Sequence, residues 1–479
     1  MSGGSVRASP EPWTTQDGNE PRAWSMDGVT FEYRSPIAAP VRLGGYVLIT
    51  ARGGEYMGQV LSKDVVDAGG HRAVRGHGRL IGTGEGVPFD DSPVTPAPAA
   101  RIRDALSSGA ARLDIGTLVV NADVPAVLHA KGFNRHTFLC GQSGSGKTYA
   151  LGVLLENLLL RTRLPLLVLD PNGDHVHLGV PRGDVAPATA EAYAAAVDGL
   201  RVLHADAGGD ASPLRIRLSE LDAAGSAALL QLDPIADREE YNALLHVLSS
   251  ASHKPFASVE EALEAFRASG DHVLELIRKR IENLGVDRMT AWAGLQARSL
   301  MEVWAQDQPR ALVADASGFE EHRERMAVAV AVLQQLWAYR RRRQPLLLVV
   351  DEAHDVCPAQ PADPLQRLAM ELFARIAGEG RKYGIHLLLA SQRPDKLPDN
   401  VLTQCDNLML MRVNSAADRQ ALAARFGFVA PSLIEMAGTF ELGESLVAGR
   451  IAPEPLLART GTRLTPEGGA DVPTDWAVG

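Results

Sequence analysis

The chain has 479 residues, 46% hydrophobic and 22% charged, as expected of a globular protein with about two or three domains. Its net charge of −10 argues against a broadly basic, nucleic-acid-binding surface, although a basic ring inside an acidic assembly would not alter the sum. The three cysteines lack C-x-x-C spacing, no apolar run is long enough for a membrane helix, and the N-terminus lacks the apolar core of a signal peptide. We therefore expect a cytoplasmic protein without a membrane partner.

The first 125 residues predict a flexible tail followed by a small β-barrel. Residues 1–27 are rich in Gly, Ser, Pro and charge, which favours a tail. Short runs of β-branched and aromatic residues then predict strands at 44–50, 55–61, 78–84 and 117–121, with a hairpin turn at Gly53-Gly54. The proline-rich segment 91–100 is expected to be irregular. We assign residues 28–125 to the barrel.

Strands alternate with helices after the barrel. Short apolar runs predict buried strands at 137–140, 164–170, 310–315, 346–350, 386–391 and 407–413. Residues 186–306 are instead rich in Ala, Leu, Glu and Arg at helical spacing, which predicts an inserted helical subdomain. Strand–helix alternation implies right-handed crossovers and a mostly parallel sheet. The predicted fold is therefore an α/β core, formed by residues 126–185 and 307–440, with a helical insertion.

Residues 138–148 carry the phosphate-loop pattern G-x4-G-K-S/T between a predicted strand and a predicted helix. Glycines let the backbone N–H groups point inward around phosphates, and the helix turns its positive end toward the same anion. Lys147 adds a cation, and Thr148 adds a hydroxyl ligand for Mg²⁺. The residues expected to bind the nucleotide are Gly141, Ser143, Gly144, Ser145, Gly146, Lys147, Thr148 and Tyr149. A glycine-rich turn without a ligand is the alternative.

An acidic motif follows the predicted strand at 346–350. Asp351 is placed to support the magnesium shell, and Glu352 is placed to polarise the attacking water. The alternative is that both carboxylates cap the next helix. Together with the phosphate loop, the motif predicts binding and hydrolysis of ATP with Mg²⁺ held by Thr148 and Asp351.

Gln392 follows the predicted strand at 386–391, so its amide can point at the γ-phosphate or the attacking water. Ligands of parallel sheets bind outside the carboxyl ends of the strands. The phosphate loop, Asp170, Asp351 and Gln392 are all predicted to lie there. A polar residue that merely leaves a strand for a loop is the other interpretation of Gln392.

With these motifs in place, the chain resembles the HerA family of DNA-translocating ATPases, relatives of FtsK and of type IV secretion motors. The resemblance rests on GQSGSGKT (141–148), LLVLDPNGD (166–174), LLLVVDEAH (346–354) and EGRKYGIHLLLASQRP (379–394). Residues 41–61 look like the family's N-terminal barrel, known as the HAS barrel. Residues 441–479 look like its C-terminal extension, which braces the neighbouring subunit. The resemblance implies a RecA-like P-loop NTPase core.

The family forms homo-hexameric rings with nucleotide between subunits and double-stranded DNA in the channel. By resemblance, Lys147, Glu352, Gln392 and Arg381 are the catalytic residues, with Arg381 as an arginine finger reaching the adjacent subunit. Arg412 is an alternative finger, and a solvated helix end is the other interpretation of Arg381. Asp174 and His175 stand where relatives commonly have Glu and an aromatic residue, which leaves the roles of Asp170 and Asp174 open.

We find no nuclease site, so the resemblance implies a NurA-like nuclease or another effector as partner, in DNA end processing or antiviral defence. A ring-forming ATP-binding scaffold and a secretion or conjugation motor are the alternative functions. Two basic clusters, 278–280 and 340–343, are expected to be a solvated face and a helix end, respectively. We see no aromatic residues among these charges, so any grip on DNA is expected to use phosphates rather than stacking.

Overall fold

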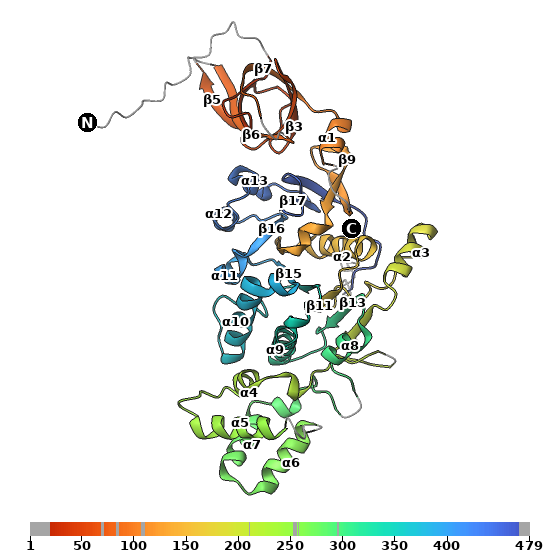
Figure 1. The fold of residues 1–479 in the computed structure, drawn as a ribbon, viewed down its shortest axis with the longest axis vertical. Coiled ribbons are helices and arrows are strands. Elements are labelled where there is room, and N and C mark those ends of the chain that lie inside the picture. The colour runs from red at the N-terminus through yellow and green to blue at the C-terminus, as the bar shows by residue number, and fades with distance from the viewer. Residues whose placement is uncertain are drawn as a thin grey trace, which may run out of the picture.

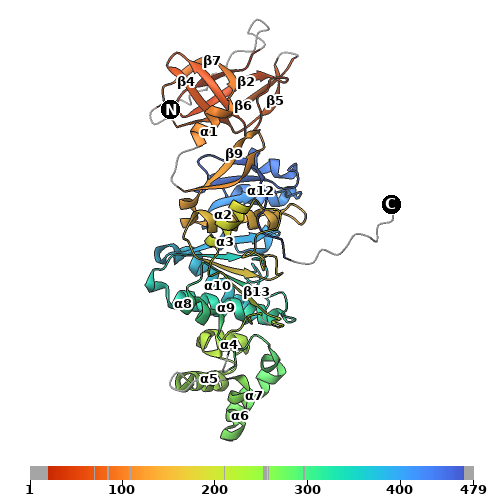
Figure 2. The same cartoon turned by 90° about the vertical axis from the view of Figure 1, so that its right-hand side faces the viewer.

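The structure is a computed structural model that describes residues 20–468, except 69–70, 83–85, 107–110, 210, 252–255, 257 and 295–296. Three parts follow one another along the long axis of the molecule (Figures 1 and 2). A β-barrel lies at one end, a large α/β layer in the middle, and a group of helices at the other end. The helices of that group are α4 (Ala223–Leu229), α5 (Arg238–Ala251), α6 (Val259–Ser269) and α7 (His272–Asn283).

The N-terminal barrel is closed by pairing of its second and sixth strands. Its sheet runs in the order β2-β1-β7-β3-β4-β6-β5, and β2 also pairs with β6. The strands are β1 (Arg22–Ser25), β2 (Thr30–Pro36), β3 (Tyr46–Ala51), β4 (Gly54–Val60), β5 (Asp64–Ala68), β6 (His71–Ile81) and β7 (Phe89–Pro96). Phe31, Tyr33 and Ile49 are fully buried in its core. The small barrel predicted from the sequence is confirmed, but the hairpin turn between β3 and β4 is Arg52-Gly53, one residue earlier than predicted, because Gly54 already pairs with Ala51.

Three other details of the prediction differ in the structure. Residues 22–25, predicted as tail, form β1, and part of the irregular segment 91–100 belongs to β7. β7 tolerates its two prolines because each of them pairs with a neighbouring strand on one side only. Pro93 pairs with β1 but lies beyond the pairing with β3, and Pro96 pairs with β3 but lies beyond the pairing with β1. Residues 117–121 are not a barrel strand. Residues 117–118 end β8 (Arg112–Leu118), residue 121 begins β9 (Asn121–His129), and 119–120 form the turn between these two strands of the central sheet. The end of the strand predicted at 78–84 lies outside the described residues.

The central sheet has 11 strands in the order β12-β13-β11-β14-β15-β10-β16-β17-β18-β8-β9. Pairing is parallel from β12 to β16 and antiparallel from β16 to β9. The parallel strands are β10 (His136–Cys140), β11 (Leu166–Asp170), β12 (Arg201–His204), β13 (Ala311–Asp315), β14 (Leu346–Val350), β15 (Ile385–Ser391) and β16 (Cys405–Leu410). The predicted α/β fold with a P-loop NTPase core is confirmed. β12 was not predicted, because its segment was assigned to the helical insertion.

Helices cover both faces of the parallel strands. β14 shows why: Leu346, Leu348 and Val350 pack into one hydrophobic cluster, while Leu347 and Val349 pack into the other. α2 (Lys147–Arg161) and α3 (Pro187–Ala196) contribute to the second cluster, and α9 (His322–Ala338) and α10 (Pro364–Glu379) contribute to the first. Each leucine or valine buried in this way stabilises the fold by about 1.5–3 kcal/mol. The remaining helices are α1 (Ala99–Leu106), α8 (Leu300–Asp307), α11 (Asp399–Leu402), α12 (Ala416–Arg425) and α13 (Pro431–Glu435).

Two arginines of the insertion form ion pairs within it. Arg278 pairs with Glu275 and Glu282, and Arg280 lies 2.9 Å from Asp237. These contacts favour the interpretation of residues 278–280 as a surface held by local ion pairs. None of the helices in the described part of the chain is both long and apolar enough to cross a bilayer.

The C-terminal segment extends the sheet of its own chain. β17 (Glu444–Gly449) pairs with β16, and β18 (Leu456–Thr460) pairs with β17 and β8. Beyond β18, the fully buried Arg463 lies 3.7 Å from Glu156 of α2. The remainder of the extension predicted to brace a neighbour, residues 469–479, lies outside the described residues.

Candidate nucleotide-binding site

The phosphate loop connects β10 to α2 at the carboxyl edge of the sheet. Gly144 and Gly146 have φ of +72° and +88°, which glycine adopts without strain. A Cβ at Gly141 would lie 2.6 Å from Ser145 Oγ, so this position also requires glycine. α2 begins at Lys147 directly after the loop, so its N-terminal end faces the space that the loop encloses. The geometry is that of an anion-binding loop rather than a simple turn.

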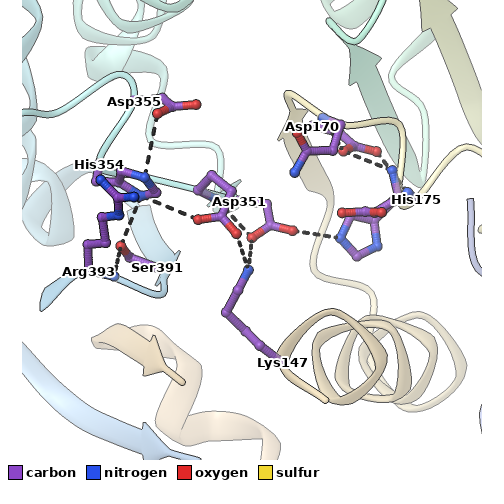
Figure 3. A network of polar contacts seen from close by, with 11 residues as sticks. Lys147, Asp170, His175, Asp351, His354, Asp355, Ser391 and Arg393 are labelled. Atoms are coloured by element: carbon purple, nitrogen blue, oxygen red, sulfur yellow. Dashed lines mark hydrogen bonds and ion pairs between the residues drawn. The ribbon is translucent and has the colours of Figure 1, made fainter. Parts of the chain in front are cut away.

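Lys147 reaches from α2 to the acidic motif that follows β14 (Figure 3). Its Nζ lies 2.5 Å from Asp351 Oδ1 and 3.0 Å from Glu352 Oε1, and all three residues are buried. Burial alone would lower the pKa of Lys147, but Asp351 and Glu352 raise it. Burial alone would raise the pKa of Asp351, but His175 and Lys147 lower it. A cation and two carboxylates therefore share one buried cluster.

The backbone turns sharply at Glu352 to place both carboxylates beside Lys147. Glu352 has φ of +42°, a left-handed conformation that is strained for a residue with a side chain. Its N–H donates to Asp351 Oδ1 at 2.8 Å. The next helix, α10, begins at Pro364 and is capped by Asp363. The alternative that Asp351 and Glu352 cap this helix is therefore excluded.

The end of β15 supplies polar groups to the same edge. His354 Nδ1 lies 3.1 Å from Ser391 Oγ and 3.3 Å from Glu352 Oε2, so it links β15 to the acidic motif (Figure 3). Gln392 follows directly, is exposed, and lines the cavity beside Lys147 and Glu352. His354 was not singled out in the sequence, although it belongs to the DEAH tetrad.

Asp170 organises the turn after β11 rather than facing the phosphate loop. Its carboxylate accepts from the backbone N–H groups of Asn172, Asp174 and His175 at 2.8–3.3 Å. Burial raises the pKa of Asp170. His175 is fully buried, with its Nε2 3.5 Å from Asp351 Oδ2, beyond an ideal hydrogen bond. The Asp-His pair that departs from the family pattern thus lies behind Asp351.

A cavity of about 690 Å³ opens in front of the phosphate loop. Gln142, Ser143, Gly144, Gly146, Lys147, Thr148, Tyr149, Glu352 and Gln392 line one part of it. The C-terminal segment supplies the rest through Leu442, Gly443, Thr460, Gly461, Thr462 and Glu467. Gly443 N–H donates to Ser145 O at 3.1 Å, which fixes this wall to the loop. Sequence reasoning missed this wall.

The two candidate arginine fingers lie at opposite edges of the sheet. Arg381 precedes β15 in the short helix η5 (Gly380–Tyr383), where its Nη1 donates to Asp406 Oδ2 at 2.6 Å. Arg412 follows β16, and its Nη2 donates to Gly144 O of the phosphate loop at 2.9 Å. The length of β15, about 20 Å, separates Arg381 from the nucleotide cavity of its own chain. The structure thus brings together all the predicted site residues except Arg381.

Comparison with known proteins finds a family model that matches the segment with the phosphate loop. Residues 113–335 match the family described as "Helicase HerA, central domain". The chain is 23% identical over 387 residues to the DNA double-strand break repair helicase HerA of Pyrococcus furiosus, covering 72% of this chain and 69% of that one. The helicase of the same name from Sulfolobus acidocaldarius is 19% identical, with 78% and 73% covered. Residues 113–335 thus carry the HerA central domain, and most of the chain is similar to HerA helicases.

Solved structures agree on the fold of this chain. VirB4 of Thermoanaerobacter pseudethanolicus superposes with a TM-score of 0.52 at 15% identity, covering 74% of this chain and 97% of VirB4. The bacterial conjugative coupling protein TrwB gives a TM-score of 0.50 at 12% identity, with 77% and 95% covered. The match to the HerA central domain and the P-loop NTPase fold together make the chain an ATP-binding and ATP-hydrolysing enzyme.

Proposed function

We propose that the chain is an ATP-driven translocase of double-stranded DNA that works as a homo-hexamer. The observation that carries the proposal is the shared cavity of Lys147, Thr148, Glu352 and Gln392 in a chain whose relatives are named DNA repair helicases. A phosphate loop, an acidic pair and a polar residue at the end of the next strand are the parts that phosphoryl transfer to water requires. Mechanical work on DNA then depends on turnover at this cavity.

Each side chain has a proposed role in hydrolysis. The loop N–H groups and Lys147 hold the β- and γ-phosphates, and Tyr149 lies at the nucleotide side of α2. Glu352 orients the attacking water and accepts its proton, and His354 holds the Glu352 carboxylate in place from behind. The Gln392 amide reads the γ-phosphate, which links the nucleotide state to β15.

The residues present fit Mg²⁺. Asp351 Oδ2 and Glu352 Oε2 are buried and form no hydrogen bond, although His175 and His354 lie 3.5 Å and 3.3 Å from them, so both oxygens can accept a metal. Glu352 and Thr148 line the same cavity. The described residues contain no cluster of three or more His, Cys, Asp or Glu side chains placed for a metal. Magnesium suits such a site, because it is usually held by one or two carboxylates together with substrate phosphates. When bound, it would neutralise charge developing on the phosphates. Thr148 and Asp351 are the proposed protein ligands.

The proposed hexameric ring accounts for the position of Arg381 at the end of β15 that lies away from the nucleotide cavity of its own chain. An arginine at the far end of β15 reaches a γ-phosphate only if that phosphate belongs to an adjacent copy. A finger supplied in this way raises the rate by about 10³- to 10⁵-fold, so hydrolysis would depend on assembly. Arg412, beside its own phosphate loop, is the alternative and would act within its own subunit.

We further propose that the motor is cytoplasmic and drives a NurA-like nuclease or another effector, in DNA end processing or antiviral defence. Relatives named DNA double-strand break repair helicases support the first of these pathways. Two other functions are the alternatives. One is a ring scaffold that binds ATP to organise an effector. The other is a secretion or conjugation motor, an alternative to which the fold similarity with VirB4 and TrwB is relevant.

Measurement of ATPase rate with and without linear duplex DNA over a salt series tests the proposal. We expect strong stimulation that fades as salt rises, because phosphate contacts release counterions. The Lys147→Ala variant should be inactive under all conditions. An ATPase rate that is the same with and without DNA at every salt concentration would contradict DNA translocation and support the scaffold function. Particle mass with ATP then tests the hexamer separately.

A further inference from the structure

A second cavity lies at the amino edge of the central sheet, away from the phosphate loop. It has a volume of about 510 Å³, within the range of ligand pockets. Its walls come from α8, from the end of α9, and from the segments that lead into β11, β13, β14 and β15. Figure 1 shows α8 and α9 together between the sheet and the helical group α4–α7. The nucleotide cavity opens at the opposite ends of these strands.

Charge in this amino-edge pocket is all of one sign. Its lining includes four arginines and no carboxylate among the described residues: Arg163, Arg310, Arg340 and Arg342. None of the four forms an ion pair with a carboxylate in the part of the chain that the structure describes. Burial lowers the pKa of Arg310, and the nearby charge of Arg163 lowers it further. Four cations around one cavity repel one another, so an anion in the pocket would stabilise it.

Aromatic rings, rather than acids, hold two of these guanidinium groups. Arg340 lies 4.4 Å from the ring centre of Trp337 and 5.6 Å from that of Tyr383. Arg342 lies 4.3 Å from the ring centre of Tyr339. Stacking orients a guanidinium group while leaving N–H groups free to donate. Arg340 Nε is buried without a hydrogen-bond partner.

These contacts also correct an expectation from the sequence. Residues 340–343 were expected to end a helix, with DNA contact as the alternative and no aromatic residues interleaved among the charges. Trp337 and Tyr339 precede this cluster in the same segment, and the fold adds Tyr383 from η5. Aromatic and basic side chains are therefore combined at this position.

We propose that the amino-edge pocket binds a nucleotide unit, with its base on the aromatic wall and its phosphate on the arginines. Trp304, Tyr339 and Tyr383 offer ring surfaces for stacking, which is worth about 1–3 kcal/mol per base. Arg163 and Arg342 are exposed arginines that can grip a phosphate through paired N–H groups. The amides of Gln308 and Gln344 both donate and accept, as a base edge requires. An acidic peptide would use the arginines but not these rings and amides.

The unit has two chemical sources, a free nucleotide and the end of a nucleic-acid strand. The full-length protein is photocrosslinked to each in turn, with azido-substituted adenosine monophosphate and with a phosphorylated oligothymidylate that carries iodouracil. Adducts are located by peptide mass spectrometry. We expect one probe or both to label Trp304, Tyr339 or Tyr383. Any label on the phosphate loop serves as an internal reference.

Charge reversal at the exposed arginines tests the site itself. Arg163→Glu with Arg342→Glu should reduce labelling of the pocket by about tenfold, because charge-assisted hydrogen bonds to phosphate are lost. Arg341→Glu is the matched control, since Arg341 is exposed, adjacent and not part of the lining, and it should leave labelling unchanged. Three results would overturn the proposal: labelling confined to the phosphate loop, pocket labelling that survives charge reversal, or binding of an acidic peptide but neither probe.

Discussion

Lys147 Nζ lies 2.5 Å from Asp351 Oδ1, so the lysine expected to hold phosphate is held by the acidic motif of its own chain. Glu352 shares the contact at 3.0 Å. A nucleotide that enters the cavity must therefore compete with two carboxylates for the same ammonium group. Under the roles proposed above, binding of ATP would exchange one set of ion pairs for another and release Asp351 and Glu352 for metal and water. In the unliganded site Lys147 is thus already paired with carboxylates and is not free for the substrate.

Removal of the lysine should destabilise the protein without nucleotide. Lys147→Ala leaves Asp351 and Glu352 buried beside each other without a cation, a loss that typically costs about 3–5 kcal/mol. Lys147→Arg keeps the charge and should cost less. Urea unfolding of both variants without nucleotide measures the difference. Equal stability of the alanine variant and the original protein would mean that the ion pair contributes nothing to the fold.

Glu352→Gln should abolish turnover while preserving ATP binding. The amide keeps the size of the side chain but cannot accept a proton, so the rate should fall about 10²- to 10⁴-fold. Lys147 retains Asp351 as its partner, which keeps the site assembled. Filter retention of labelled ATP and a phosphate-release assay give both quantities. Asp355→Asn is the control, because Asp355 follows in the same turn but does not line the cavity. Unchanged turnover would remove Glu352 from its proposed role.

Mixed assemblies should separate Arg381 from Arg412. If Arg381 acts on the adjacent copy, a mixture of Arg381→Ala and Lys147→Ala subunits creates some interfaces with both groups intact. Activity of the mixture should then exceed that of either parent. Arg412→Ala mixed with Lys147→Ala should show no such gain if Arg412 acts within its own subunit, beside Gly144. Absence of any gain with Arg381→Ala would leave this residue with only its local partner, Asp406.

The C-terminal wall of the nucleotide cavity depends on one buried glutamate. Glu156 accepts from Leu464 N–H and Thr465 N–H at 2.8 Å each, and it lies 3.7 Å from Arg463 Nε. Glu156→Ala should leave Arg463 with Glu467, 3.6 Å from its Nη1, as its remaining carboxylate, and should remove the contacts that hold the segment of Leu464 and Thr465 to α2. We expect faster hydrogen exchange in this segment and a higher KM for ATP. Asn157→Ala is the control, because this neighbour bonds only within its own helix. Unaltered exchange would show that β18 alone fixes the wall.

The parts of the site that the sequence predicts are those with local signals. β14 is a run of five apolar residues followed at once by Asp351, and the phosphate loop is one contiguous motif. Both lie where their patterns require. The wall formed by Gly443 and Glu467 has no such signal, because its contacts join residues some hundreds of positions apart.

Other features were missed for different physical reasons. β7 contains prolines, which lack a backbone N–H donor, so its sequence predicts an irregular segment. The strand forms because the pairing with β1 and the pairing with β3 each include only one of the two prolines. The stacking of Arg340 on Trp337 was available in the sequence, since residues three apart share a helix face. Tyr383 joins them only through the fold.

Acid should destabilise the core through His136. This fully buried histidine accepts from Leu387 N–H at Nδ1 and contacts Ala377 O through Nε2 at 3.0 Å, an arrangement that requires the neutral ring. Burial, together with the nearby charges of Arg381, His386 and Arg135, lowers the pKa of His136 to about 3. In the unfolded chain the pKa is about 6.5, so between these values the unfolded state binds a proton that the folded state does not.

Stability should therefore fall as the pH drops below about 6.5, by about 2 kcal/mol at a pH of about 5. Urea unfolding across this range measures the loss. His136→Gln removes the titrating group. The variant should be less stable at neutral pH, but its stability should lack the loss of about 2 kcal/mol that His136 causes at a pH of about 5. The comparison isolates His136 because other carboxylates and histidines titrate equally in both proteins. Parallel pH curves for the two proteins would mean that the buried ring accepts a proton without unfolding.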